Sequence, residues 1–259
     1  MAMIAVRFCM MAAILMSSLP AKADEIHHEM EYSVALSGLP IARASFSTSM
    51  DNKRYKIDGN ISSAGIANLI TRISARTTVS GTVSADRFQA RNYLLNYTSG
   101  KKTRVYEVNF RNGNVTSNSI TPEPRRNPNN WVPVTEKDLR AVLDPISGII
   151  LPANKQVCPA RLPIFDGETR MDLVLSPKDS KPFSTKGFKG DAIVCSVQFV
   201  PKAGFKKNRK DIDYLKKLKT MEIWFAKADP VNVYAPVYVK IPTEYGMLTV
   251  SAVKFGGNT

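Results

Sequence analysis

The strongest constraint on the fold is a two-residue periodicity in the C-terminal segment, residues 221–255. Apolar residues occupy every second position in two runs there, namely Met221, Ile223 and Phe225, then Val237, Val239 and Ile241. A third run, rich in β-branched residues, covers 247–255, and turn-forming residues separate the three runs. Because successive side chains of a β-strand point to opposite faces, this pattern predicts a three-stranded antiparallel meander.

The same periodicity recurs through most of the preceding chain. Alternating runs occur near 32–36, 42–46, 55–61, 77–84, 93–97, 106–110 and 193–199. Turn sequences separate them, and Asn112-Gly113-Asn114 is the strongest hairpin signal. Short strands at regular spacing favour an antiparallel meander. We therefore expect a mainly β protein, built as a single antiparallel curled sheet or open β-barrel with two or three short helices.

Two segments predict helices within this β pattern. In residues 65–76, apolar side chains recur every three or four positions, at Ile66, Leu69, Ile70 and Ile73. This spacing predicts an amphipathic helix of about three turns. Thr135 is a suitable N-cap for a second, short helix through Leu143, and Asp138 suits its first turn. The proline-rich stretch 121–133 predicts an exposed loop.

Residues 1–23 have the organisation of a cleavable export signal. A basic start precedes an apolar stretch, and Ala21 and Ala23 supply the small residues that signal peptidase accepts. The apolar stretch is shorter than the ~20 residues that a membrane-spanning helix needs. We therefore predict cleavage before Asp24 and a single periplasmic β domain over 24–259.

Two cysteines remain once the leader, which carries Cys9, is removed. Cys158 and Cys195 form an even pair in a chain predicted to be exported, and an oxidising compartment drives such thiols together. A metal site or a catalytic thiol is the rival interpretation, but no histidine or second cysteine pair lies nearby in the sequence. We therefore predict a disulfide between Cys158 and Cys195.

The chain is basic, with 36 lysines and arginines against 22 acidic residues. Removal of the leader takes away Arg7 and Lys22 and so lowers the formal net charge from +14 to +12. Excess positive charge outside the cytoplasm suits an anionic envelope surface, and it also serves ordinary solubility. Nucleic acid is not an expected partner, because an exported protein would rarely meet it.

The segment 202–219 concentrates this charge. Ile212, Leu215 and Leu218 share one helical face within it. A basic amphipathic helix can rest on an anionic membrane, although such a run is more often a solvated loop and helix. The candidate contacts with an anionic surface are Lys206, Lys207, Arg209, Lys210, Lys216 and Lys217.

Catalytic candidates are few. The sequence lacks G-x-S-x-G, H-E-x-x-H and a glycine-rich phosphate loop. Its two histidines, His27 and His28, lie close to the predicted mature N-terminus, so a triad with Ser147 and Asp144 would need that end to cross the domain. The chain is therefore predicted to have no enzymatic activity, no cofactor and no metal site. A weak divalent-cation cluster is the alternative, formed by Glu25, His27, His28, Glu29 and Glu31.

A carboxylate-dependent hydrolase of cell-wall polymer or glycan is the alternative function. Paired catalytic carboxylates have no sequence spacing of their own, so they escape a motif search. The candidates are Asp144, Asp166, Glu168, Glu222 and Asp229. Each of these residues also suits a turn or a cap.

A ligand or partner surface is predicted from the placement of aromatic residues. The candidate residues are Trp224, Asp229, Tyr234 and Trp131. Aromatic side chains recur on alternating faces of the predicted strands. The sheet therefore has more apolar surface than one buried face can hide. Such a sheet either curls around a cavity or closes on a filled core, and the sequence leaves both possibilities open.

Several stretches, in this order, together resemble one known family. They are Gly38-Leu39-Pro40-Ile41-Ala42, Leu143-Asp144-Pro145-Ile146-Ser147, Phe165-Asp166-Gly167-Glu168-Thr169-Arg170, and the closing residues Trp224, Asp229, Pro236, Val237 and Gly246. This pattern resembles an uncharacterised Gram-negative envelope family, domain-of-unknown-function family 3108. The resemblance covers most of the mature chain and implies an exported antiparallel β protein. It implies no activity.

The functional hypothesis is a non-enzymatic periplasmic protein of cell-envelope maintenance. It would bind an apolar or amphipathic envelope ligand, such as a lipid, or a protein partner. The export signal, the aromatic-rich sheet and the positive charge motivate this hypothesis. A purely structural interaction protein without a small ligand is a third possibility.

Overall fold

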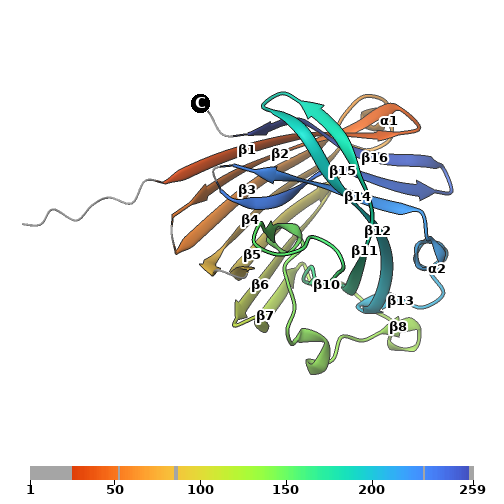
Figure 1. Cartoon of the computed structure of the whole chain (residues 1–259). Helices are drawn as coiled ribbons and strands as arrows, with labels where there is room; N and C mark the ends of the chain where they lie inside the picture. The colour runs from red at the N-terminus through yellow and green to blue at the C-terminus, as the bar shows by residue number, and fades with distance from the viewer. Residues whose placement is uncertain (1–24, 52, 85–86, 230, 257–259) are drawn as a thin grey trace, which may run out of the picture.

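The computed structural model describes residues 25–51, 53–84, 87–229 and 231–256, so the predicted leader lies outside the described residues. A 14-stranded sheet dominates it (Figure 1). The strands are β1 (Ile26–Leu36), β2 (Leu39–Met50), β3 (Arg54–Ser63), β4 (Ile73–Ser84), β5 (Arg87–Ser99), β6 (Lys102–Arg111), β7 (Asn114–Thr121), β9 (Leu151–Pro152), β10 (Ala160–Phe165), β11 (Arg170–Thr185), β12 (Phe188–Ala203), β14 (Met221–Ala228), β15 (Val233–Thr243) and β16 (Gly246–Gly256). Two short strands, β8 (Trp131–Val132) and β13 (Phe205–Lys206), pair separately.

The sheet follows the order β10-β11-β12-β14-β15-β16-β1-β2-β3-β4-β5-β6-β7, with β9 beside β15. The predicted C-terminal meander is confirmed as β14, β15 and β16. β16 then pairs with β1, from Glu29 opposite Gly256 to Leu36 opposite Leu248, and so joins the two halves of the sheet. Figure 1 shows the sheet curling, and within the described residues its edge strands β7 and β10 do not pair. The expected curled, open sheet is confirmed.

Buried apolar side chains form two core clusters. The first core cluster includes Ile57, Val79, Val108, Val237 and Phe255, all at most 1% exposed. The second core cluster lies around β10, β11, β12 and β14, and it includes Leu162, Ile164, Leu175, Cys195 and Phe225. Because the sheet curls, the β14 region contributes to both clusters, and its strand is buried on both faces.

The predicted helix over 65–76 is wrong in extent. Only α1 (Ala67–Ile70) is helical, and β4 already begins at Ile73. Gly65 has a φ of +55°, which is not helical, and Ile73 pairs with Ser99 of β5. No sheet or helix in the described part of the chain covers the four apolar side chains of the predicted helical face, which are exposed at Ile66, Leu69, Ile70 and Ile73.

The second predicted helix is shorter than expected and of the 3₁₀ type. It covers η2 (Glu136–Leu139), and the predicted cap is confirmed as a capping box of Thr135 and Asp138. The helix ends because Arg140 is extended, Ala141 has a φ of +51°, and the Val142 amide donates to the Gly113 carbonyl at 2.7 Å. Two further 3₁₀ turns are η1 (Pro128–Asn130) and η3 (Ser147–Ile149).

The basic segment forms α2 (Lys210–Lys217), which packs near β12. The predicted apolar face of Ile212, Leu215 and Leu218 is half-buried, and Leu215 lines an apolar groove of about 150 Å³ beside Ile241. Because this face covers the sheet, only the charged side of α2 is available to a surface. No helix in the described part of the chain is long and apolar enough to cross a membrane.

His28 lies on β1, and its side chain is 2% exposed and packs beside the first core cluster. Its ring packs edge-on against Phe255 at 5.2 Å, and its Nε2 atom has no hydrogen-bond partner among the residues that the structure describes. Met30, Thr48 and Phe88 share the small space around it, and none of them titrates. Burial therefore lowers the pKa of His28 below its ordinary value of 6.5.

The His28 pKa predicts a pH-dependent stability. Below pH 6.5 the unfolded chain binds a proton that the folded chain excludes, so the free energy of unfolding falls as the pH falls, with a limiting slope of about 1.4 kcal/mol per pH unit. Urea unfolding of wild type and His28→Phe between pH 7.5 and 5.5 measures this contribution, which the variant lacks. His27→Gln is the matched control, because His27 is 58% exposed in its side chain. Equal slopes in wild type and His28→Phe would contradict the assignment.

Candidate functional site

A cavity of about 500 Å³ lies between β5, β6 and the segment 141–163. Its walls are mainly apolar, and they include Phe88, Phe110, Val142, Ile150 and Leu162. Phe88 and Phe110 come from two neighbouring strands of the sheet, whereas the other three come from the segment that packs over them. The sequence left a cavity and a filled core open, and the curled sheet contains both.

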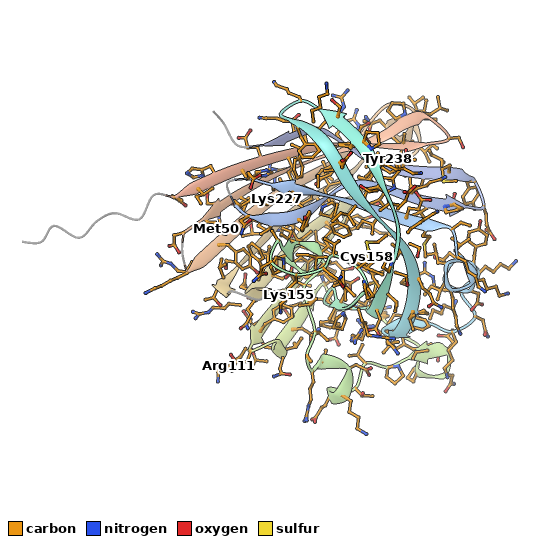
Figure 2. The ribbon with its side chains drawn as sticks, in the orientation of Figure 1. Met50, Arg111, Lys155, Cys158, Lys227 and Tyr238 are labelled. Carbon is orange, nitrogen blue, oxygen red and sulfur yellow. A yellow bond between two sulfur atoms is a disulfide. The ribbon has the colours of Figure 1, made fainter. Side chains whose placement is uncertain are left out.

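Exposed polar residues surround this cavity on the side of the β9–β10 loop. Lys155, Gln156 and Arg161 line it and are exposed. Lys155 is labelled in Figure 2, in the same loop as Cys158. The cavity therefore combines apolar walls with a cationic and amide rim.

A buried polar network forms one wall of the cavity. Asp144 is 1% exposed and accepts hydrogen bonds from the backbone amides of Ile146 and Ser147, at 2.9 and 2.8 Å, and from the Ser147 hydroxyl. The Ser147 hydroxyl also lies 2.8 Å from the Tyr55 hydroxyl. Burial raises the pKa values of Asp144 and Tyr55. Asp144 thus anchors the turn at the start of η3.

This network is not a nucleophilic triad. The Ser147 hydroxyl bonds to Asp144 and Tyr55 and not to an imidazole. His28 packs on Phe255, and His27 is exposed and lies 3.1 Å from the Ser49 hydroxyl. Because β1 alternates its side chains, the two histidines face opposite sides of the strand. In the alternative N-terminal cation cluster, His28 likewise faces away from His27, Glu29 and Glu31.

The four residues of the predicted ligand surface do not lie in one place. The Trp131 ring contacts the Arg126 guanidinium at 5.1 Å, beside the small β8–β13 sheet. The Trp224 ring packs on Tyr238 at 4.8 Å. Tyr234 packs against the second core cluster, and Asp229 pairs with Lys227 at 3.4 Å.

β-Sheet pairing explains why Trp224 and Tyr234 are apart. Tyr234 is opposite Lys227, and Trp224 is opposite Tyr238. Lys227 and Trp224 are an odd number of residues apart on β14, so their side chains point to opposite faces. A single surface that uses both aromatic residues is therefore not formed.

The predicted anionic-surface contacts are mostly available to solvent. Lys206, Lys210, Lys216 and Lys217 are exposed. Lys207 donates to the Asn129 carbonyl at 3.2 Å, and Arg209 pairs with Asp211. The six residues therefore differ in role, and two of them also stabilise local structure.

The predicted disulfide joins Cys158 to Cys195, with a Cα–Cα distance of 6.3 Å. Cys195 lies on β12 in the second core cluster, and Cys158 lies in the β9–β10 loop. The bond therefore fixes the loop that supplies the polar rim of the cavity.

Each carboxylate of the hydrolase alternative has a structural partner. Asp166 accepts from the Glu168 and Thr169 amides in the β10–β11 turn, at 2.9 and 2.6 Å. Glu168 pairs with Arg126 at 3.0 Å, and Glu222 pairs with Lys178 at 2.5 Å. A hydrogen bond from Lys178 lowers the pKa of Glu222, and burial raises that of Asp166. In these contacts Asp166 stabilises a turn, and Glu168 and Glu222 form ion pairs.

Sequence reasoning missed the cavity residues Phe88, Val142 and Ile150. Phe88 lies on β5, far in the chain from Val142 and Ile150 in the segment 141–163, and each of the three is an ordinary apolar residue. Among the residues that line the cavity, Phe110 lies in one of the predicted alternating runs, 106–110, and this alternation is the one available signal.

The described fold has a known counterpart. The crystal structure of a beta-barrel-like protein of domain of unknown function DUF1849 from Brucella abortus matches with a TM-score of 0.52 and 7% identity. The match covers 92% of this chain and 100% of that one, and at this identity it shows the fold alone. No curated protein matches the chain. The model of the family described as protein of unknown function (DUF3108) matches residues 31–253, and the chain belongs to this family.

Proposed function

We propose that the protein is a non-enzymatic binding protein of the cell envelope, and that the cavity beside Asp144 holds an amphipathic envelope molecule. The observation that carries this proposal is the 500 Å³ cavity with apolar walls and a polar rim. Sites for small molecules are concave, mostly apolar and typically ≈ 300 to 1,000 Å³ in volume. The apolar part of a ligand would pack on Phe88, Phe110 and Ile150, and its polar end would lie near Gln156 and Arg161.

The periplasmic location is part of the same proposal. The predicted leader and the Cys158–Cys195 disulfide support it, because disulfides persist in oxidising compartments. The charge of the chain, +14 in full and +12 without the predicted leader, suits a ligand with an anionic head group.

Native mass spectrometry of the protein, purified from its own periplasm without detergent, tests the proposal. We expect extra mass that is lost on denaturation, and its value gives the class of ligand. A bare protein that also fails to take up anilinonaphthalene sulfonate, an amphipathic anion, would overturn the proposal. It would favour a purely structural interaction protein.

Filling the cavity is expected to block ligand uptake. Ala90→Trp and Ala160→Trp each place an indole in the cavity, one from β5 and the other from β10. Each variant is expected to bind anilinonaphthalene sulfonate about tenfold more weakly in a fluorescence titration, which corresponds to ≈ 1.4 kcal/mol. Ser119→Trp is the matched control, because Ser119 is exposed on β7 and lies outside the cavity. If the control loses as much binding as the cavity variants, the probe binds elsewhere.

A further inference from the structure

Three connections at one end of the sheet present apolar side chains to solvent. Leu39 begins β2 directly after the β1–β2 turn, and Tyr245 lies in the β15–β16 turn. Ile66, Leu69 and Ile70 lie in the β3–β4 connection. The exposed fractions are 55% for Leu39, 52% for Ile66, 88% for Leu69, 85% for Ile70 and 84% for Tyr245. We call these five residues the apolar tip. Seven large apolar side chains are exposed among the described residues, and five of them lie here, so this concentration is unusual for a free surface.

Backbone hydrogen bonds hold the three connections side by side. The Ser37 amide donates to the Met247 carbonyl at 2.8 Å, which links the β1–β2 turn to β16. The Ala64 amide donates to the Ile41 carbonyl at 2.8 Å, which links the β3–β4 connection to β2. Figure 1 shows α1 and the β15–β16 turn at the same end of the molecule, opposite the start of β1. The apolar tip is therefore one surface feature built from three loops.

Cations flank the apolar tip on the side of β5. Arg72, Lys101 and Lys102 are exposed, and the Gly100 amide donates to the Arg72 carbonyl at 2.9 Å, which brings the β5–β6 turn beside the β3–β4 connection. Glu244 is the exposed acid of the β15–β16 turn. Within the described residues, Arg72, Lys101 and Lys102 form no ion pair, so their charge is available to an outside partner.

The basic helix α2 flanks the apolar tip on the other side. Leu215 of α2 and Ile241 of β15 line the same groove, and β15 ends two residues later at Thr243. The exposed Lys216 and Lys217 therefore lie near the β15–β16 turn that carries Tyr245. Positive charge thus borders the apolar tip on both sides.

The shape and charge of this end fit one kind of partner. The side chains of Leu69 and Ile70 protrude from a short connection, whereas a surface for a folded protein is usually broad and complementary in shape. An apolar tip that is bordered by lysines and arginines matches the layers of a bilayer, in which acyl chains lie beneath anionic head groups. A tyrosine suits the boundary between these layers.

We propose that the apolar tip inserts into the head-group region of a bilayer that contains anionic phospholipid, while Arg72, Lys101 and Lys102 bind the phosphates. This surface is separate from the cavity, so the proposal goes beyond the proposed ligand and stands without it. It also gives the charged side of α2 a place on the same membrane surface.

Flotation with vesicles tests the proposal. The wild-type protein is expected to float with vesicles of phosphatidylglycerol and phosphatidylethanolamine at low ionic strength, and to bind pure phosphatidylcholine vesicles at least about tenfold more weakly. Leu69→Asp combined with Ile70→Asp is expected to lower binding to the anionic vesicles at least about tenfold, because it places two charges in the apolar layer. The matched control is Val253→Asp, since Val253 is also an exposed apolar residue, 47% exposed, but lies on β16 away from the turn.

A charge-reversal variant separates the two parts of the surface. Arg72→Glu, Lys101→Glu and Lys102→Glu together are expected to weaken binding to anionic vesicles about a hundredfold, at ~1 kcal/mol per basic residue. This variant should bind phosphatidylcholine vesicles as the wild type does. Circular dichroism melting curves check that each variant remains folded.

Three results would overturn the proposal. One is a wild-type protein that floats with neither kind of vesicle, and another is an equal loss for Val253→Asp and the Leu69 and Ile70 variant. The third is self-association in analytical ultracentrifugation that disappears in the Leu69 and Ile70 variant without any vesicle binding, which would assign the apolar tip to contacts between copies. The cavity proposal is unaffected by any of these results, because anilinonaphthalene sulfonate uptake is measured without vesicles.

Discussion

Replacing Cys158 and Cys195 together by serine is expected to lower the free energy of unfolding by about 3 to 4 kcal/mol. The disulfide spans 37 positions, and opening it gives the unfolded chain more conformations. Both cysteines lie in the second core cluster, at 9% and 0% exposure, so the paired hydroxyls add a cost of their own. Urea unfolding, followed by circular dichroism, measures the change, and a thiol titration confirms the oxidised state of the wild type.

The reduced wild type is the control for this prediction. The reduced wild type keeps both sulfur atoms in the core and loses only the cross-link. The difference in stability between it and the serine variant therefore gives the cost of burying the serine hydroxyls. An unfolding midpoint that is the same with and without reductant would show that the bond does not stabilise the fold.

Replacing Asp172 by alanine is expected to cost about 3 to 5 kcal/mol, the range for a buried ion pair that loses one partner. Asp172 is 3% exposed and pairs with Arg161 at 2.6 Å, with Arg170 at 2.5 Å and with Lys202 at 3.6 Å. Burial opposes the charge of Asp172, but hydrogen bonds from Arg170 and Arg161 outweigh it and lower its pKa. Without Asp172, the Arg170 guanidinium, which is 11% exposed, keeps its charge but loses its carboxylate partner.

Asp179→Ala is the matched control on the same strand. Asp179 is 52% exposed and lies 4.0 Å from Lys181, so its loss should cost less than about 1 kcal/mol. Removing both charges, with Asp172→Leu and Arg170→Leu, should cost less than Asp172→Ala alone. Thermal and urea unfolding give the three values. Similar costs for Asp172→Ala and Asp179→Ala would show that the buried position of Asp172 adds nothing.

The strands were predictable because their signal is local. The alternation in 221–255 and the Asn112-Gly113 turn each specify structure within a few residues, and the structure has β14, β15, β16 and the β6–β7 hairpin there. The positive φ angles of Asn112 and Gly113, 53° and 77°, are those that such a turn needs. The sheet order was not predictable in the same way, because the pairing of β16 with β1 joins residues more than 200 positions apart.

The helix prediction over 65–76 failed because spacing alone does not say what covers a face. Leu69 and Ile70 follow Ile66 at helical spacing, yet they are 88% and 85% exposed in the described structure, and β4 takes Ile73 into the sheet. The same residues became the centre of the apolar tip. Places where a local sequence rule fails in this way are expected to be functional or strained sites.

The candidate site was predictable only in part. The disulfide followed from a compartment argument that needed no geometry. The cavity depends on Phe88, Val142 and Ile150, which meet only because the sheet curls and the segment 141–163 packs over it. Alternation along the strands places Trp224 and Tyr234 on opposite faces of the large sheet, whereas Trp131 lies apart from both in the small β8–β13 sheet.

The pairing of β16 with β1 makes the order of assembly asymmetric. The strands from β1 to β7 form one run of neighbouring hairpins, which close early because their contacts are local. The strands from β10 to β16 form a second run, and the two runs become one sheet only when the last strand pairs with the first. Until then, the edges of β1 and β16 are open to any other strand. Before β16 pairs with β1, the incompletely folded chain is therefore most exposed to wrong strand pairing with other chains.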